Sequence, residues 1–180
     1  MIPTPTLATK LGTTTHLSPL LHKARRLGLD GEKLQILAVQ RGCDHYRTGD
    51  EPETPLASES ALSNEELAIA LLCVALPYDP RSIRCGAAML GADGNSPETL
   101  VRQAILERSE VPVRYVALAG HKFEPENPFW SRLLSLLPEV PIPDNGALPH
   151  PTRFVSMTGF TQKGPGLVVW WERPRPRLTA

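Results

Sequence analysis

The sequence predicts a mainly α protein: an array of short antiparallel helices followed by a C-terminal β-hairpin. Three observations lead to this fold class. Helix-start patterns recur about every sixteen residues between Ser63 and Asn127, apolar residues between them follow helical spacing, and two β-rich runs lie near the end of the chain. A length of 180 residues suits a single domain.

Each helix start pairs an oxygen-bearing cap with a favourable first-turn residue. The cap accepts a hydrogen bond from a backbone N–H that has no partner within the helix, and proline at the first position has no N–H to satisfy. These starts are Ser63 with Glu66, Asp79-Pro80, Ser96-Pro97, Ser109 with Pro112, and Asn127-Pro128. They predict five helices, over 64–75, 80–90, 97–109, 112–122 and 128–137.

The apolar pattern indicates how these helices pack. The helix over 64–75 is apolar on more than one face, so we expect it to be central. Gly86, Ala87 and Ala88 form a small-residue surface that permits a close helix approach. The last helix is expected to bury four large side chains, Phe129, Leu133, Leu136 and Leu137.

Four segments make up the predicted domain. Residues 1–42 form an extended Thr- and Pro-rich arm (1–17) and a corner of two helices, which end near Gly28 and Gly42. Residues 43–62 are an acidic linker, mobile unless a partner holds it. The helical array occupies 63–137. Residues 138–180 comprise a proline-rich connection, the hairpin formed by RFVSMTGF and GLVVWWE, and a basic tail.

The helix-pair period of about 32–33 residues resembles that of tetratricopeptide repeats. The resemblance extends to the turns at Asp79-Pro80 and at 124–128, whereas the aromatic and small-residue consensus of that family is not followed. It implies that successive helical pairs stack side by side.

Composition narrows the function classes. Nineteen basic residues balance nineteen acidic ones, which argues against binding nucleic acid by bulk charge alone and favours self-association. Three cysteines without CxxC spacing are typical of reduced thiols in a cytoplasmic protein. The first thirty residues contain no secretory signal, and no apolar run approaches the ~20 residues of a membrane span. The histidine and cysteine spacing indicates no metal site, so no cofactor is expected.

We expect a non-catalytic interaction or structural subunit of a larger cytoplasmic assembly, bound to a protein partner. A two-stranded hairpin is marginal by itself, so it invites pairing with another chain. Trp170 and Trp171 are neighbours on a strand and point to opposite faces, so one of them can anchor a partner. With Phe154 on the other run, they form the predicted interface.

Two alternatives remain open. A helical subunit could contact the phosphate backbone of a nucleic acid through its arginines, for which the candidates are Arg25, Arg26, Arg81, Arg84, Arg173 and Arg175. An enzyme of unfamiliar type could use Cys43 and His45, a thiol and an imidazole close together in the chain. Adjacent residues seldom face one another, and this pair begins the linker, so the residues favour this enzyme least.

Overall fold

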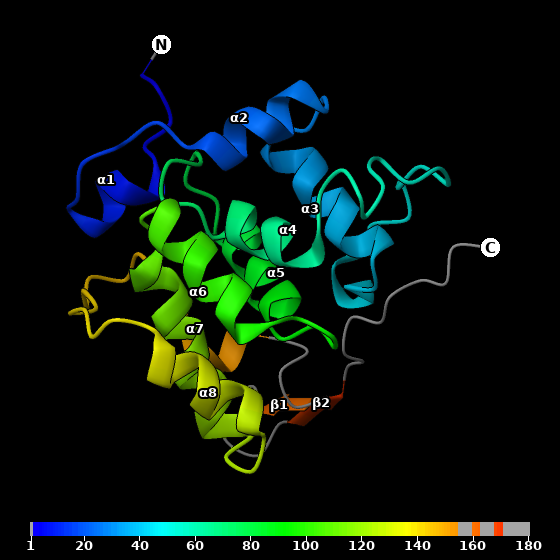
Figure 1. Ribbon diagram of the computed structural model, residues 1–180. Helices are drawn as coiled ribbons and strands as arrows, with labels where there is room; N and C mark the ends of the chain where they lie inside the picture. Colours follow the sequence, from blue (N-terminus) through cyan, green and yellow to red (C-terminus); the bar gives the residue numbers. More distant parts are fainter. Residues whose placement is uncertain (1, 155–159, 163–167, 171–180) are drawn as a thin grey trace.

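The computed structural model describes residues 2–154, 160–162 and 168–170, and this part of the chain contains eight α-helices (Figure 1). The helices are α1 Leu7–Leu11, α2 Pro19–Arg26, α3 Gly31–Gln40, α4 Asn64–Leu71, α5 Pro80–Leu90, α6 Pro97–Leu106, α7 Glu110–Phe123 and α8 Pro128–Leu136. Two single-turn 3₁₀ helices, η1 Asp44–Tyr46 and η2 Pro151–Arg153, lie in the connecting segments. The protein is mainly helical, as predicted.

The five helices predicted between residues 63 and 137 are confirmed as α4 to α8. The side chains of Ser63, Asp79, Ser96 and Asn127 each accept a hydrogen bond from a backbone N–H of the first turn. Ser109 makes no such bond, and α7 begins at Glu110, two residues before the predicted start. Local capping chemistry therefore places four of the five starts correctly.

Helix α4 is enclosed by its neighbours. All side chains from Leu67 to Leu71 are at most 1% exposed, and α4 contacts α2, α3, α5 and α6. In a linear stack of repeats each unit contacts its neighbours along the chain. The contacts of α4 fit this arrangement, because they join it to α5 and to helices of the pairs directly before and after it, so successive helical pairs stack side by side as the period implies.

Two glycines allow close helix approaches. A Cβ on Gly86 would lie 2.8 Å from Cγ of Leu72, which confirms the predicted small-residue surface on α5. A Cβ on Gly120 would lie 2.4 Å from the ring of Trp130, so α8 packs onto α7 through an indole placed directly over glycine.

Trp130 is the principal core residue of α8, and the sequence analysis did not predict this. Its side chain is 1% exposed, and its Nε1 donates to Oε2 of Glu124 at 2.7 Å. Phe129 and Leu136, which were expected to be buried, are only half-buried. The indole was overlooked because apolar spacing alone does not reveal that glycine leaves room on the facing helix.

The N-terminal segment is docked on the helices, and it is not extended throughout. Residues 7–11 form α1, which begins at the side chain of Thr6. The N–H of Ala8 donates to the carbonyl of Val74 at 2.7 Å, and the N–H of Tyr78 donates to the carbonyl of Pro5 at 2.7 Å. The prediction of an extended arm over residues 1–17 is therefore wrong over α1.

The acidic segment 43–62 is held by the protein itself. Nε2 of Gln40 donates to the carbonyl of Pro52 at 2.8 Å and to the carbonyl of Thr54 at 3.0 Å. The guanidinium of Arg41 donates to the carbonyl of Ser58 at 3.3 Å. Because both donors are buried, the segment has the anchoring that the sequence analysis expected only from a partner.

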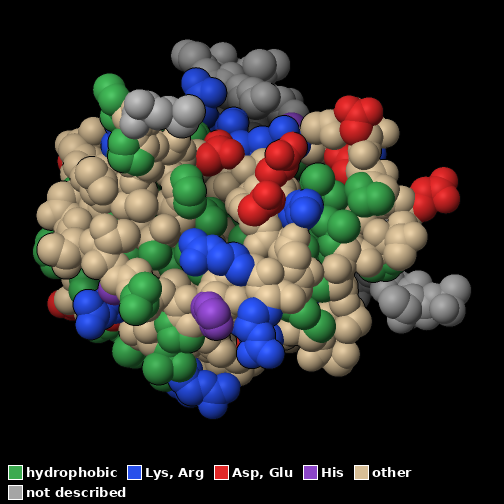
Figure 2. Space-filling model, turned by 90° about the horizontal axis from the view of Figure 1, so that it is seen from above, with side chains coloured by type: hydrophobic (Ala, Val, Ile, Leu, Met, Phe, Trp, Pro, Cys, Tyr) green, Lys and Arg blue, Asp and Glu red, His purple; other side chains and the backbone are tan. Residues whose placement is uncertain are grey.

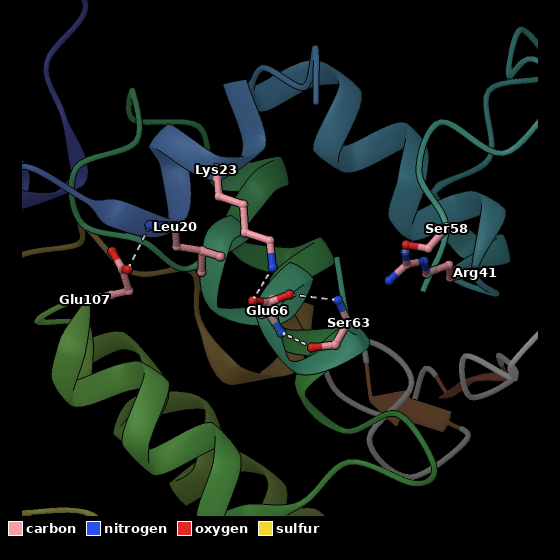
Figure 3. A network of polar contacts seen from close by, with 7 residues as sticks. All are labelled: Leu20, Lys23, Arg41, Ser58, Ser63, Glu66 and Glu107. Atoms are coloured by element: carbon pink, nitrogen blue, oxygen red, sulfur yellow. Dashed lines mark hydrogen bonds and ion pairs between the residues drawn. The ribbon is translucent and has the colours of Figure 1, made fainter. Parts of the chain in front are cut away.

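Polar contacts, buried at Glu107 and exposed at Lys23, join α2 to the helices below it (Figure 3). The carboxylate of Glu107, which follows α6, accepts from the N–H of Leu20 at 2.9 Å and from the hydroxyl of Ser18. Nζ of Lys23 forms an ion pair with Glu66 of α4 at 2.7 Å. Glu107 thus satisfies the start of α2, where backbone N–H groups lack helical partners.

Beyond α8 the chain runs irregularly through the proline-rich connection to η2. Two short strands follow, β1 Phe160–Gln162 and β2 Val168–Trp170, which pair antiparallel with Phe160 opposite Trp170. The rest of the predicted hairpin lies outside the described residues, so the hairpin stays a prediction. Among the helices described, none combines the length and apolarity needed to cross a membrane.

Candidate ligand-binding cleft

A cleft of about 820 Å³ lies between α5, α7 and the segment from residue 142 to residue 153. This volume falls within the ~300–1,000 Å³ that is usual for ligand sites. Its walls are mostly apolar and aromatic, with a few charged groups. The lining residues are Tyr78, Pro80, Arg84, Tyr115, Leu118, Ala119, Lys122, Ile142, Pro143, Asp144, Gly146, Leu148, Pro149, His150, Pro151 and Arg153.

Helix geometry explains the two regular walls. On α7, Tyr115, Leu118, Ala119 and Lys122 recur at intervals of three and four residues, so they share one face of the helix. On α5, the cap by Asp79 sets the start of the helix and thereby the direction of Arg84, about one turn further on.

The irregular wall is held in place by two tyrosines. The hydroxyl of Tyr78 donates to the carbonyl of Ala147 at 2.9 Å, and the hydroxyl of Tyr115 donates to the carbonyl of Pro149 at 2.8 Å. Phe154 packs edge-on against Tyr115, with ring centroids 5.8 Å apart. A proline-rich segment without regular structure is thereby anchored on the helices.

The hydrogen bond from Tyr115 is secure over the physiological pH range. Burial, and to a lesser degree the charge of Asp144, raises the pKa of Tyr115 above its ordinary value. The phenol therefore keeps the proton that it donates to the carbonyl of Pro149.

Positive charge predominates in the cleft. Arg84, Lys122 and Arg153 face a single carboxylate among the lining residues, that of Asp144. Nε of Arg84 is buried and has no hydrogen-bond partner within the described part of the chain. Leaving a buried donor unpaired costs free energy, and because this atom is closed to water it is also closed to a ligand oxygen of similar size.

Two ionisable side chains near Arg84, those of Tyr46 and Cys85, are uncharged at neutral pH. Tyr46 lies close enough for its charge to interact with Arg84, and its buried hydroxyl has no hydrogen-bond partner among the described residues. Burial raises the pKa of Cys85 to about 12, although the charges of Arg81 and Arg84 oppose the shift. The thiol is therefore protonated at neutral pH, and a protonated thiol is a poor nucleophile.

The predicted phosphate-binding arginines are not brought to one site in the described structure. Arg25 and Arg26 are exposed on α2, where His22, Lys23 and Arg26 line a shallow hollow. Figure 2 views the molecule from the α2 side and shows basic side chains and a histidine gathered on this face. That hollow shares no lining residue with the cleft, to which Arg84 belongs.

The other predicted contact residues have different positions. A nitrogen of Arg81 donates to the carbonyl of Tyr46 at 2.7 Å, so this arginine is engaged within the fold. Arg173, Arg175 and Trp171 lie outside the described residues, and for Trp170 only the strand is described. Their roles stay predictions.

Phe154 was predicted as part of a partner interface, and the structure corrects this. Its side chain is fully buried and packs on Tyr115. The β-rich run that begins at Arg153 therefore starts in the core, because an aromatic ring next to a buried tyrosine is stabilised there by removal from water.

Cys43 and His45 lie in different environments. The side chain of Cys43 is fully buried, whereas His45 is exposed and packs edge-on against Tyr46, with ring centroids 5.2 Å apart. Neither residue lines the cleft. The role of this pair stays a prediction.

Most of the cleft was not predicted from the sequence. Arg84 was among the candidate residues, whereas Lys122, Tyr78 and Tyr115 were not. The spacing of Tyr115, Leu118 and Lys122 on one helical face was the available signal, but the same spacing is typical of an ordinary core face.

Compared with protein-family models, with curated proteins and with solved structures, the chain matches none of them. Within the described residues, no group of three or more His, Cys, Asp or Glu side chains is arranged to hold a metal ion. What the cleft offers chemically is a positive, partly apolar surface with a half-buried arginine, which suits recognition of an anionic ligand.

Proposed function

We propose that this protein is a non-catalytic interaction subunit that binds a segment of a partner protein in the cleft. The observation that carries the proposal is the anchored wall: Tyr78 and Tyr115 hold residues 147–149 against α5 and α7. A preformed cleft spends little of its binding free energy on ordering itself, which favours a role in recognition. Its walls come from segments far apart in the chain, so the folded domain itself is the binding unit.

Trp170 and Trp171 keep a part in this proposal as a second contact surface. The truncation that tests them must leave the cleft intact. It must therefore retain Phe154, because this residue packs on Tyr115 in the wall of the cleft. A chain ending after Phe154 should therefore retain its helicity by circular dichroism and retain the cleft. Weaker partner binding by this chain would support the tryptophan contact, and unchanged binding would remove it from the proposal.

Site-specific photo-crosslinking tests the cleft itself. Leu118 lines the cleft and is 41% exposed, whereas Leu106 is 62% exposed on α6 and does not line it. A benzophenone amino acid at position 118, in the cells that make the protein, should form a discrete covalent adduct with one partner chain. The same group at position 106 is the matched control.

The adduct at position 118 should disappear when the cleft is filled by Ala119→Trp, in a variant shown by circular dichroism to be folded. Ala119 lines the cleft and is nearly buried, so a large side chain there occupies the space of the ligand. Equal adducts from positions 118 and 106, or an adduct that survives the blocked cleft, would contradict the proposal.

A second candidate function is contact with nucleic acid through α2. It is favoured by the basic last turn of that helix, where Lys23, Arg25 and Arg26 lie together. Binding to unrelated oligonucleotides that falls steeply with salt, and that is weakened by Arg25→Gln with Arg26→Gln, would support it. Salt-independent binding or none at all would remove it.

A further inference from the structure

We infer that the partner segment bound in the cleft is an acidic peptide. Its carboxylates would face Arg84, Lys122 and Arg153, and its apolar side chains would face Leu118 and Ile142. This inference rests on the proposed function and names the chemistry of the partner.

Charge complementarity is the first argument. The cleft presents three cationic side chains from three separate elements, namely α5, α7 and η2, against one carboxylate. Cations on different walls can each meet a different residue of an extended ligand. A single small anion would leave some of them without a partner.

Arg84 is the second argument, because it is a half-buried residue that lines the cleft. A carboxylate forms a charge-assisted, frequently bidentate hydrogen bond with a guanidinium, so an acidic side chain suits this residue better than a neutral amide would. Lys122 and Arg153 are exposed and add contacts at the edge.

The apolar wall favours a peptide over a nucleic acid. Leu118 is 41% exposed, and Ile142 and Leu148 lie on the opposite wall, so the ligand must bury apolar groups of its own. Base stacking would need a free aromatic face, but Tyr115 packs against Phe154, and Nζ of Lys10 lies over the ring of Tyr78, 5.3 Å from its centroid. Asp144 would also repel a continuous phosphate backbone, whereas a peptide can place a neutral residue opposite it.

Fluorescence polarisation with the full-length protein tests this inference. The probes are a fluorescein-labelled nonapeptide library of Glu, Leu, Pro, Ser and Gly, the same library with Lys in place of Glu, and an oligothymidylate of similar length. The acidic library should bind at least about tenfold more tightly than either of the others, since charge of the correct sign attracts and like charge repels.

Charge-removing variants locate the binding. Lys122→Gln and Arg153→Gln should each weaken binding of the acidic library about two- to fivefold, more at low salt than at high salt. Arg102→Gln is the matched control, because Arg102 is an exposed cation on α6 that does not line the cleft. It should leave binding unchanged apart from the small effect of net charge.

Each outcome decides the inference. Equal binding of the acidic and basic libraries, binding of the acidic library that is unaffected by the double Lys122→Gln, Arg153→Gln variant, or tighter binding of the oligothymidylate would overturn it. If position 118 forms a cleft-dependent partner adduct but the acidic library does not bind, the proposed function stands and the acidic preference falls. If neither occurs, both fall.

Discussion

Charged groups buried at the α2–α6 junction have partners within the protein, whereas the buried guanidinium atom at the cleft has none. Glu107 is 2% exposed and accepts from Ser18 and Leu20. Nε of Arg84 is also removed from water and is unpaired in the described structure, although Arg84 as a whole is half-buried. The buried ring nitrogens of His16, in the segment before α2, likewise have no partner among the described residues.

Buried groups that have partners at the α2–α6 junction stabilise the fold, whereas the unpaired guanidinium atom at the cleft does not. A buried charge with good partners holds two elements in register, and removing it leaves those partners unsatisfied. A buried donor without a partner contributes no such stability, so a substitution that removes it leaves no partner unsatisfied. Substitutions in the two regions should therefore differ in how much they lower the free energy of unfolding.

The largest expected effect follows from breaking the junction. Glu107→Ala leaves the hydroxyl of Ser18 and the N–H of Leu20 without their acceptor, so we expect the free energy of unfolding to fall by about 2–4 kcal/mol. Urea denaturation measures this, with the exposed Glu126→Ala as control. A loss below about 1 kcal/mol would show that the buried carboxylate is not stabilising.

A smaller loss is expected at Arg41. Burial lowers the pKa of Arg41 below its ordinary value, and the carboxylates of Glu59 and Glu66 oppose this, so the guanidinium is held as a partnered charge. Arg41→Met should cost about 1–3 kcal/mol and expose segment 43–62 to proteolysis, because its carbonyl contacts are lost. Arg25→Met, on an exposed arginine, is the control. Unchanged proteolysis would contradict the anchoring.

Denaturation at alkaline pH tests whether the thiol of Cys85 keeps its proton in the folded protein. The pKa of Cys85 is about 12 in the folded protein against an ordinary value of 9.0, so the folded state holds its proton while the unfolded chain loses its own. Stability from this group is complete below pH 9 and declines as the pH rises toward 12, by up to about 1 kcal/mol between pH 9 and pH 10.

Urea denaturation at pH 8, 9 and 10 should show this decline, and Cys85→Ala should flatten it even if that variant is less stable overall. The slope with pH, not the absolute stability, is therefore the quantity to compare. Equal slopes in both proteins would assign the decline to other groups, of which the buried thiol of Cys73, whose pKa burial also raises, is the first candidate.

The smallest expected effect lies in the cleft. Arg84→Met removes a charge that has no partner in the described residues and keeps the apolar stem, so the free energy of unfolding should change by less than about 0.5 kcal/mol. Thermal and urea denaturation check this. A loss above about 1.5 kcal/mol would place Arg84 with Glu107 as a stabilising group and would remove the contrast between the regions.

Sequence reasoning located most helices but little of the cleft. Ser63, Asp79, Ser96 and Asn127 were identified as caps because each acts on an N–H only two or three residues away. Trp130 was not predicted as a core residue because its position depends on Gly120, which lies on another helix. Arg84 was selected as a candidate contact to the phosphate backbone of a nucleic acid and not as a residue of a cleft. Nothing in the local sequence indicates which charged side chains will be removed from water.

The sequence by itself determined where α4 to α8 begin, their approximate lengths and the central place of α4, because capping and apolar spacing are local properties. Only the tertiary structure decided the cleft. Tyr78 and Tyr115 bind carbonyls 69 and 34 residues further along the chain. A pairing over such a separation depends on how the helices pack around α4, and that packing decides which groups lose water and which keep it.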